Sequence, residues 1–547
     1  MNYTENSEKY EGDSIASLNW LNILPSLQGK RVLLCNFEKN KRTENFIHLQ
    51  AATLQYIDFF SLGKNKKNII FIQNNNDICI INVLNKKHFS ISHFKKNLQI
   101  LIELLRTDVL LILIIPSGFQ KIKFKFFVKN ILRSYGLKNI KSYLCIPSFK
   151  DPYAIHYISN KSKLQFKLFS NQHVKNFSKI IKIEKLIKQI IKYLCVRFFS
   201  SVNYFSETII ISCRSNDYNV NINFDESIKK ISNDNFKKNQ YYIDWLAKSF
   251  KYIGLFYGDN KKHELLAVCK KTFSKAHRSN CIKEEHDKLT LMSVYRNEFR
   301  SKRTEIPSPI YFESKDEKIL SIETAIHGKS LENYKWKLTN QKENANFFKN
   351  LDELVNIQIY FQNLLSSKHA KDFPKLSNKY FINTTQISHS DLDNLQRVDA
   401  YAGCVQHGDF TDVNIIYNSK DNLWGIIDWE WSASGFPFLF DLFHLLTSLE
   451  FRSNMNNNES LFQHFYLSNK ETFFEKNFYS NYIQNVITNY CNYFCLKIDH
   501  VFQFYLDFLL FHYNKYYYDF HEYNYAELYR KNILFSVNNQ NKFITYN

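Results

Sequence analysis

Three oxygen-bearing side chains in the C-terminal half of the chain have the types and spacing that phosphoryl transfer needs. Asp409 follows His407 and Gly408, Asn414 comes five residues later, and Asp428 ends the apolar run LWGIID. Moving a phosphoryl group from ATP requires a carboxylate that takes the proton of the acceptor hydroxyl, and oxygen ligands for the metal. We expect Asp409 to accept the proton, and Asn414 and Asp428 to bind Mg²⁺, which prefers hard oxygen ligands.

The elements around these residues explain how they could converge. The run LWGIID predicts a short buried strand, whose end would place the Asp428 carboxylate beside the loop that carries Asp409 and Asn414. The tripeptide HGD alone is an ordinary loop sequence, so three unrelated loop residues are the alternative. The second segment at fixed spacing, IDWEWSASGFPFLFDL, disfavours that alternative.

A known family contains a similar pair of segments. The catalytic loop and metal-binding aspartate of the aminoglycoside phosphotransferase and choline kinase family resemble HGDFTDVN followed by IDWEWSASGFPFLFDL. The resemblance implies a bilobal protein-kinase-like fold, ATP and Mg²⁺ as cofactors, and Asp409 as the catalytic base. It also implies that His407 and Gly408 shape the loop and that Glu430 and Asp441 support it, with Asp441 accepting backbone hydrogen bonds.

A hairpin upstream is expected to hold the phosphates of the nucleotide. The segment KYIGLFYGDNKKHELLAVCKK predicts two strands that turn at 258–260 and end at Lys270 and Lys271. Lys270 is the preferred phosphate ligand because it shares a face with apolar residues. The alternatives are that Lys271 is the ligand, or that both lysines are only a solvated strand end. No glycine-rich phosphate loop is evident, since only Gly254 and Gly258 precede Lys270, which leaves a catalytically silent nucleotide-binding scaffold as a rival.

A helix and a hinge would complete this lobe. The helical run CIKEEHDKLTLMSVY contains Glu285, which the resemblance makes the partner of the lysine, with Glu284 as the alternative. The segments IPSPIYFES and KILSIETAIHGKSL predict two further strands and the hinge. There, backbone groups near Glu323 and Ala325 would hydrogen-bond adenine.

The N-terminal part of the chain predicts a mainly parallel α/β sheet. Apolar runs predict strands over 31–37, 53–60, 68–73, 77–84 and 108–115, helices over 92–106 and 123–136, and an antiparallel pair over 138–148 and 152–159 that closes a sheet edge. This order resembles a Rossmann-like class I methyltransferase. The loop after the first strand, CNFEKNKRTEN, lacks the glycines that a cofactor needs, so we interpret the domain as degenerate. The alternative is a doubly wound domain for packing or partner binding.

The expected fold class is a multidomain α/β and α+β chain. Its predicted parts are a methyltransferase-like domain (1–165), a basic helical connector and linker (166–239), a kinase-like N-lobe (240–330) and a kinase-like C-lobe with the catalytic loop and acceptor pocket (331–547). The connector contains a basic amphipathic stretch, 173–199. Its apolar side is expected to pack on a neighbouring domain, with peripheral contact with an anionic membrane as the alternative.

The composition limits the partners. A net charge of +20 would favour nucleic acid, but lysine occurs together with much Asn, Ile, Phe and Tyr and few Gly and Pro, as in proteins of AT-rich genomes, so no nucleic-acid partner is expected. Ten scattered cysteines predict a reducing cytoplasm, and the polar N-terminus lacks a secretory signal. The most apolar window, 98–115, is interrupted by charges and does not predict a membrane span.

The acceptor is expected to be a small hydroxylated molecule bound between aromatic-rich helices over 461–469, 480–494 and 500–518. The combination of HGDFT, IDWEWS and DLFH is most similar to phosphotransferases of surface-polysaccharide biosynthesis, which favours a sugar or glycan precursor. Choline, another amino alcohol and an aminoglycoside remain alternatives.

Overall fold

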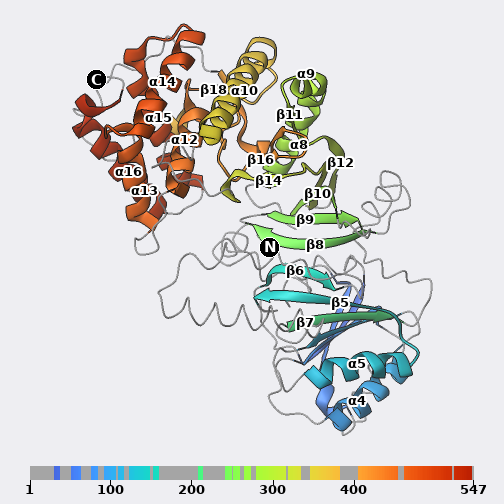
Figure 1. Cartoon of the computed structure of the whole chain (residues 1–547). Coiled ribbons are helices and arrows are strands. Elements are labelled where there is room, and N and C mark those ends of the chain that lie inside the picture. The colour runs from blue at the N-terminus through green and yellow to red at the C-terminus, as the bar shows by residue number, and fades with distance from the viewer. Residues whose placement is uncertain are drawn as a thin grey trace, which may run out of the picture. The chain divides into compact units, whose positions relative to one another are not determined.

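The chain folds into two compact units in a computed structural model (Figure 1). One unit comprises Met1–Ser279 and Glu313–Ile322, and the other comprises Asn280–Phe312 and Glu323–Asn547. The structure describes residues 30–36, 51–62, 76–83, 91–105, 109–115, 122–147, 152–158, 207–213, 241–248, 251–258, 264–272, 279–315, 318–333, 345–381, 404–453, 461–519 and 523–544. The stretches 68–73 and 173–199, for which a strand and a basic helix are expected, lie outside the described residues.

A twelve-stranded mixed sheet forms the body of the first unit. Its parallel part runs in the order β2 (Thr53–Ile57), β1 (Arg31–Cys35), β3 (Ile78–Asn82) and β4 (Leu110–Ile115). Residues of β3 and β4 are buried without alternation, as expected for parallel strands that are covered on both faces. Helices α4 (Ile91–Leu104) and α5 (Ile122–Ser134) share one apolar core with these strands.

Most of the predicted N-terminal elements are confirmed, and the antiparallel pairing of β5 (Lys138–Pro147) with β6 (Pro152–Ile158) is present. The expectation that this hairpin closes the sheet edge is wrong. The strand β7 (Glu207–Cys213) pairs between β4 and β5, and β8 (Tyr241–Lys248) pairs with β6. Long-range strands therefore satisfy the backbone groups that an edge would expose.

The same sheet continues through the strands expected to form the N-lobe. Beyond β8 follow β9 (Lys251–Gly258), β10 (Leu265–Thr272), β13 (Lys318–Thr324) and β12 (Pro309–Lys315). The predicted β9–β10 hairpin is confirmed by its antiparallel pairing, whereas β8 was not predicted. In the sequence, positions 239 and 240 lie between β7 and β8 of this sheet, and the two compact units divide after Ser279. The four predicted domains stay predictions.

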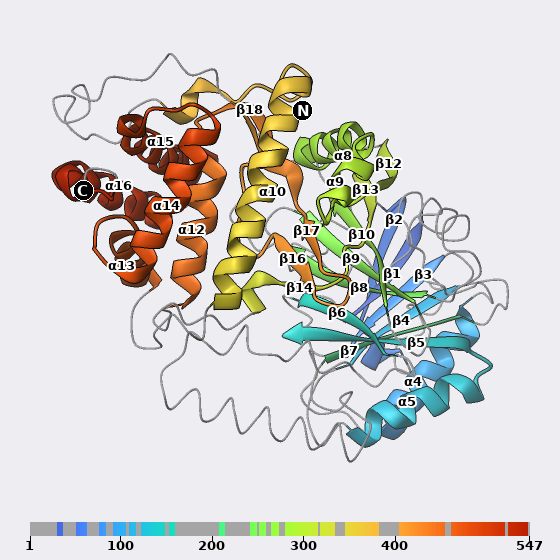
Figure 2. The same ribbon diagram turned by 45° about the horizontal axis from the view of Figure 1, so that its top comes forward.

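The second unit contains a small four-stranded sheet that carries the candidate site. Its order is β11 (Thr304–Glu305), β17 (Leu423–Ile426), β16 (Ile415–Asn418) and β14 (Lys329–Ser330), and a separate pair joins β15 (Cys404–Gln406) to β18 (Ala433–Phe436). Figure 2 shows α10 (Ala345–His369) beside these strands, with α12 (Phe440–Ser453) and α14 (Phe478–Tyr493) on the other side of α10. The remaining helices are α8 (Ser279–Ser293), α9 (Arg296–Ser301), α13 (Leu461–Phe473), α15 (Val501–Asn514) and α16 (Tyr523–Asn538).

One large aromatic-rich core holds this unit together. The segments expected to be aromatic-rich helices form α13, α14 and α15, and the predicted helix containing Glu285 forms α8. Phe440 and Phe443 of α12 pack against Phe508 of α15, so these two helices are in direct contact in the core. No described helix is long and apolar enough to cross a membrane.

Candidate active site

The loop that carries Asp409 is fixed by a carboxylate from α12. Asp441 lies in the first turn of that helix, and its two carboxylate oxygens accept hydrogen bonds from the backbone N–H groups of His407 (2.7 Å) and Gly408 (2.9 Å). Burial raises the pKa of Asp441 to about 7, and the two N–H donors oppose that rise. The hydrogen bonds expected of Asp441 are therefore present. They fix the backbone of the two residues that precede Asp409.

Gly408 has a conformation and a position that require glycine. Its φ is +79°, and a Cβ atom there would lie 2.6 Å from the carbonyl oxygen of Trp431 and 2.9 Å from the ring of Phe436. Any side chain would meet both a strained backbone and a steric clash. The close approach brings Trp431 beside the residue that precedes Asp409.

His407 connects this loop to the strand that leads to Asp428. Its Nε2 lies 3.0 Å from the Ile427 carbonyl oxygen, and its Nδ1 accepts a hydrogen bond of 3.3 Å from the Asp409 N–H. The neutral Nε2–H tautomer satisfies both contacts. Burial lowers the pKa of His407 to about 4, so the ring is neutral at physiological pH. Its role is that of a clamp between two backbone segments.

Asp409 and Asn414 are in direct contact. The amide nitrogen of Asn414 donates hydrogen bonds of 2.9 Å to the carbonyl oxygen of Asp409 and 2.9 Å to its Oδ2. The Asn414 amide oxygen is then the atom that can act as a metal ligand. The Asp409 side chain is 30% exposed, whereas Asn414 is buried, so Asp409 is the member that a substrate could reach.

The hairpin of β16 and β17 brings Asp428 next to Asn414. Ile415 pairs with Ile426, and the N–H of Ile427 donates to the carbonyl oxygen of Asn414 at 3.0 Å. Asp428 then adopts a left-handed conformation, with φ of 66° and ψ of 58°, and begins the 3₁₀ turn Trp429–Trp431. Such a conformation is uncommon outside glycine and turns the chain sharply at the end of the strand. The predicted strand ending before Asp428 is confirmed.

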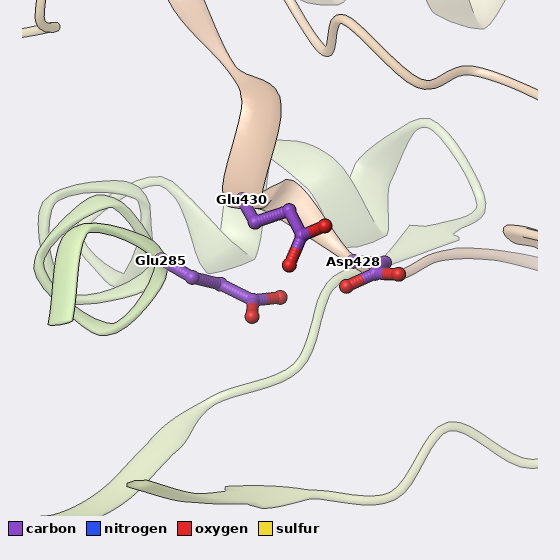
Figure 3. A group of neighbouring side chains, drawn as sticks. All are labelled: Glu285, Asp428 and Glu430. Carbon is purple, nitrogen blue, oxygen red and sulfur yellow. The ribbon is translucent and has the colours of Figure 1, made fainter. Parts of the chain in front are cut away.

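Glu285 and Glu430 lie close to Asp428. Figure 3 shows the three side chains together, and one carboxylate oxygen of each lies within 4.8 Å of the others. Glu285 Oε1 also accepts a hydrogen bond of 3.0 Å from the Trp429 N–H, and Lys288 Nζ donates to the Glu430 carbonyl oxygen at 2.7 Å. Three converging carboxylates repel one another, and a divalent cation with oxygen ligands would relieve that repulsion.

The expected hinge lies against the same small sheet. Glu323 and Ala325 are both buried, and the intervening Thr324 exchanges two hydrogen bonds with Ser308. Gly328 has a φ of +143°, and a Cβ atom there would lie 2.6 Å from the Tyr417 carbonyl oxygen of β16. The hinge therefore continues directly into β14, which pairs with the strand that follows Asn414.

The two lysines of β10 belong to the first unit, so their pairing with Glu285 stays a prediction. Both are buried, and burial lowers the pKa of Lys271 to about 8. Lys271 Nζ lies 5.8 Å from the centre of the Trp245 ring. A Cβ atom on Gly254 would lie 3.0 Å from the same indole, so this glycine serves the packing of Trp245.

The sequence did not single out three residues near Asp409. His444 of α12, His512 of α15 and Lys515, which begins the π-helical turn Lys515–Asp519, are buried or nearly so, and His444 Nε2 lies 3.8 Å from Asp409 Oδ1. Each lies among aromatic residues in the sequence. His444 could have been recognised from the segment DLFH, in which it follows Asp441 by three residues.

A family model supports the assignment of this region. Residues 350–467, which include Asp409, Asn414 and Asp428, match the phosphotransferase enzyme family. No curated protein matches the chain.

Several solved structures are similar to the chain. Aminoglycoside phosphotransferase APH(3'')-Id from Streptomyces rimosus, in complex with ADP and streptomycin, is 11% identical over 56% of this chain and 97% of its own, with a TM-score of 0.31. An aminoglycoside-3'-phosphotransferase of type VIII is 9% identical over 48% of this chain and 98% of its own, with a TM-score of 0.26. A precorrin 8w decarboxylase from Methanobacterium thermoautotrophicum is 8% identical over 36% and 86%, with a TM-score of 0.17.

The family match and the loop geometry concern the same residues. The segment 350–467 includes the Asp409 loop, which is hydrogen-bonded to Asp441, and the hairpin that ends before Asp428. Residues 350–467 of this chain, which carry the candidate site, are therefore similar to the phosphotransferase enzyme family.

Proposed function

We propose that the chain is an ATP- and Mg²⁺-dependent phosphotransferase that acts on a hydroxyl group of a small molecule. The observation that carries the proposal is the clamp formed by Asp441 and His407. It fixes the Asp409 loop to α12 on one side and to the strand before Asp428 on the other. A loop held in this way positions a base and metal ligands without reorganisation during the reaction.

Asp409 is proposed as the catalytic base. Its Oδ2 is held by the Asn414 amide, which leaves Oδ1 to accept the proton of an acceptor hydroxyl. Asn414 and Asp428 would hold Mg²⁺, with Glu430 close enough to contribute, and the ion would neutralise the polyphosphate. His407 and Gly408 keep the loop in the required conformation.

The nucleotide side of the proposal uses the β10 lysine and the hinge. Lys270 is proposed as the phosphate ligand, with Lys271 as the alternative, and Glu285 as its partner. Glu285 also orients Trp429, the residue after Asp428, through a hydrogen bond. Backbone groups of Glu323 and Ala325 are proposed to bind adenine.

The acceptor is proposed to be a sugar or glycan precursor, and an amino alcohol or aminoglycoside is the rival within the same reaction class. The N-terminal sheet is proposed to be a methyltransferase-like domain without a cofactor site, in a protein of the cytoplasm. Calorimetry with S-adenosylmethionine tests this part, since micromolar binding would contradict it. Liposome sedimentation tests the membrane alternative for 173–199.

The phosphotransferase proposal is tested by Mg²⁺-dependent ATP turnover with a panel of sugars and amino alcohols. The wild type should show acceptor-stimulated turnover, and Asp409→Ala should lose it. Asp421→Ala is a matched control, because Asp421 is an exposed aspartate at the turn of the same hairpin. A wild type that shows no acceptor-stimulated turnover would instead support a catalytically silent scaffold.

A further inference from the structure

The two carboxylate oxygens of Asp409 face different surroundings. Oδ2 accepts the hydrogen bond from Asn414, on the side of the proposed metal ligands. Oδ1 lies 3.8 Å from His444 Nε2, a distance too long for a hydrogen bond. An acceptor hydroxyl that donates to Oδ1 would therefore lie next to the His444 ring. The side chains around His444 are then the ones that meet the rest of the acceptor.

Those side chains form a group that we call the histidine–lysine cluster: His444, His512, Lys515 and Trp431. The rings of His444 and His512 are 4.6 Å apart, and His512 is only 2% exposed. In the described part of the chain, His444 Nδ1 and both ring nitrogens of His512 make no hydrogen bond. Buried polar atoms of this kind are rare, and they mark a place where a ligand or water would normally bind.

Lys515 supplies the positive charge of the cluster. Its Nζ lies 3.8 Å from the centre of the Trp431 ring, and the side chain is 5% exposed. The lysine follows the last residue of α15, where the helix continues into the π-helical turn Lys515–Asp519. Trp431 is the residue whose carbonyl oxygen approaches Gly408, so the ammonium group is held close to the Asp409 loop.

The charge balance of the cluster discriminates between kinds of acceptor. A quaternary ammonium group would bind over an aromatic face, but Lys515 already occupies the face of Trp431. A polyamine would need carboxylates, and the carboxylate beside His444 is Asp409, whose Oδ1 lies 3.8 Å from His444 Nε2 and is proposed to act as the base. Two neutral imidazoles and an ammonium group offer N–H donors, which are the partners that an anion requires.

We propose that His444, His512 and Lys515 select an acceptor that carries an anionic group, a carboxylate or a phosphate, beside the hydroxyl that is phosphorylated. The proposal rests on the phosphotransferase function, since it names the acceptor class of the same site. It separates the expected acceptors, because uronic acids and sugar phosphates fit the cluster and choline and aminoglycosides do not. A bound anion would also accept a hydrogen bond from the ring N–H group of a neutral histidine in the cluster.

Binding of matched sugars to the full chain tests the proposal. For the gluco, galacto and manno series, the hexose, its uronic acid, its 6-phosphate and its 2-amino sugar would be titrated by calorimetry with Mg²⁺ and a non-hydrolysable ATP analogue. At least one anionic member should bind about tenfold or more tightly than the amino sugar of its series. The uronic acid and phosphate arms distinguish the two sources of negative charge.

Substitutions at position 515 assign the selectivity to the cluster. Lys515→Met keeps the apolar stem on Trp431 and should reduce the affinity for the anionic sugar about tenfold. Lys515→Arg should retain the preference. Lys302→Met is the matched control, because Lys302 also lies over an aromatic ring, 5.0 Å from the centre of Tyr360, but on the exposed surface.

Three results would overturn the proposal: amino sugars that bind as tightly as anionic ones, no binding of any anionic sugar, or an unchanged preference in Lys515→Met. The outcome is distinguishable from failure of the phosphotransferase function. Asp409→Asn should abolish phosphoryl transfer and still bind the anionic sugar selectively. Selective binding by a wild type that transfers no phosphate would contradict the proposed reaction and leave the recognition of the anion in place.

Discussion

Asp441 Oδ2 accepts a hydrogen bond of 2.7 Å from the backbone N–H of His407, 34 residues earlier in the chain. Oδ1 of the same carboxylate accepts from the next backbone N–H, that of Gly408. The start of α12 and the Asp409 loop are thus joined by one side chain. A substitution at Asp441 should therefore affect the proposed role of Asp409 through the position of its loop, without removing a contact to the substrate.

Asp441→Asn is expected to lower kcat about tenfold or more. An amide has one acceptor oxygen, so its NH₂ group would face one of the two backbone N–H donors, and a buried donor would lose its partner. The KM for ATP should change little, because Asp441 contacts no proposed nucleotide ligand. Steady-state kinetics with Asp421→Asn as the surface control check this. Wild-type kcat in Asp441→Asn would show that the loop does not depend on this contact.

Gly408→Ala should destabilise the second unit by about 2 kcal/mol or more, through the positive φ and the contact with the Trp431 carbonyl. Gly435→Ala is the matched control, since its φ is +90° but the nearest atoms to the added Cβ are 3.9 Å away. This control should cost only about 1–2 kcal/mol. Thermal unfolding of both variants measures the difference, and equal losses would show that the close approach at Gly408 is not a constraint.

Stability should decrease between pH 6.5 and pH 4 because of His444. Burial lowers its pKa from 6.5 to about 4, while the Asp409 charge opposes the decrease and Lys515 and His407 add to it. The unfolded chain therefore binds the proton more tightly, and this contribution to stability is complete above pH 6.5 and lost as the pH falls through 4. From pH 7 to pH 5 the free energy of unfolding should decrease by about 2 kcal/mol.

His444→Phe checks the origin of that pH dependence, since it keeps an aromatic ring beside Phe508 and His512. Thermal unfolding of the variant should vary less between pH 7 and pH 5 than that of the wild type. An identical pH dependence in the two proteins would assign the effect to other groups.

Glu430→Gln should raise the unfolding temperature in EDTA and reduce the stabilisation that Mg²⁺ gives. The three carboxylates of Glu285, Asp428 and Glu430 lie within 4.8 Å of one another, so removal of one charge relieves repulsion when no cation is present. Thermal unfolding with and without Mg²⁺ measures both effects. Glu305→Gln, which removes a partly exposed carboxylate paired with Arg300, is the control.

The sequence predicted the strand that ends before Asp428, and placed Asp409 and Asn414 in one loop, because this information is local. Asp409 and Asn414 are five residues apart, and the strand that ends before Asp428 follows after a short turn, so spacing alone brings them together. His444, His512 and Lys515 lie on helices far along the chain. Their approach to Asp409 depends on how α12 and α15 pack, and no spacing in the sequence encodes that packing.

The strand order of the large sheet likewise could not be predicted from local sequence. Continuous apolar runs predicted β3 and β4, and the hairpin of β5 and β6 followed from its two neighbouring runs. The neighbours of that hairpin, β7 and β8, come from about 50 and 80 residues later. Strand pairing at such separations is decided by the folded chain, which is why the hairpin was wrongly expected at an edge.

The central claim is that Asn414 and Asp428 bind one divalent ion beside the proposed base Asp409. Its most direct test is the affinity for Mn²⁺, measured by electron paramagnetic resonance with a non-hydrolysable ATP analogue. The wild type and Asp421→Ala should bind the ion with equal affinity, and Asn414→Ala and Asp428→Ala should each bind it about tenfold or more weakly. Unchanged Mn²⁺ affinity in both site variants would contradict the account.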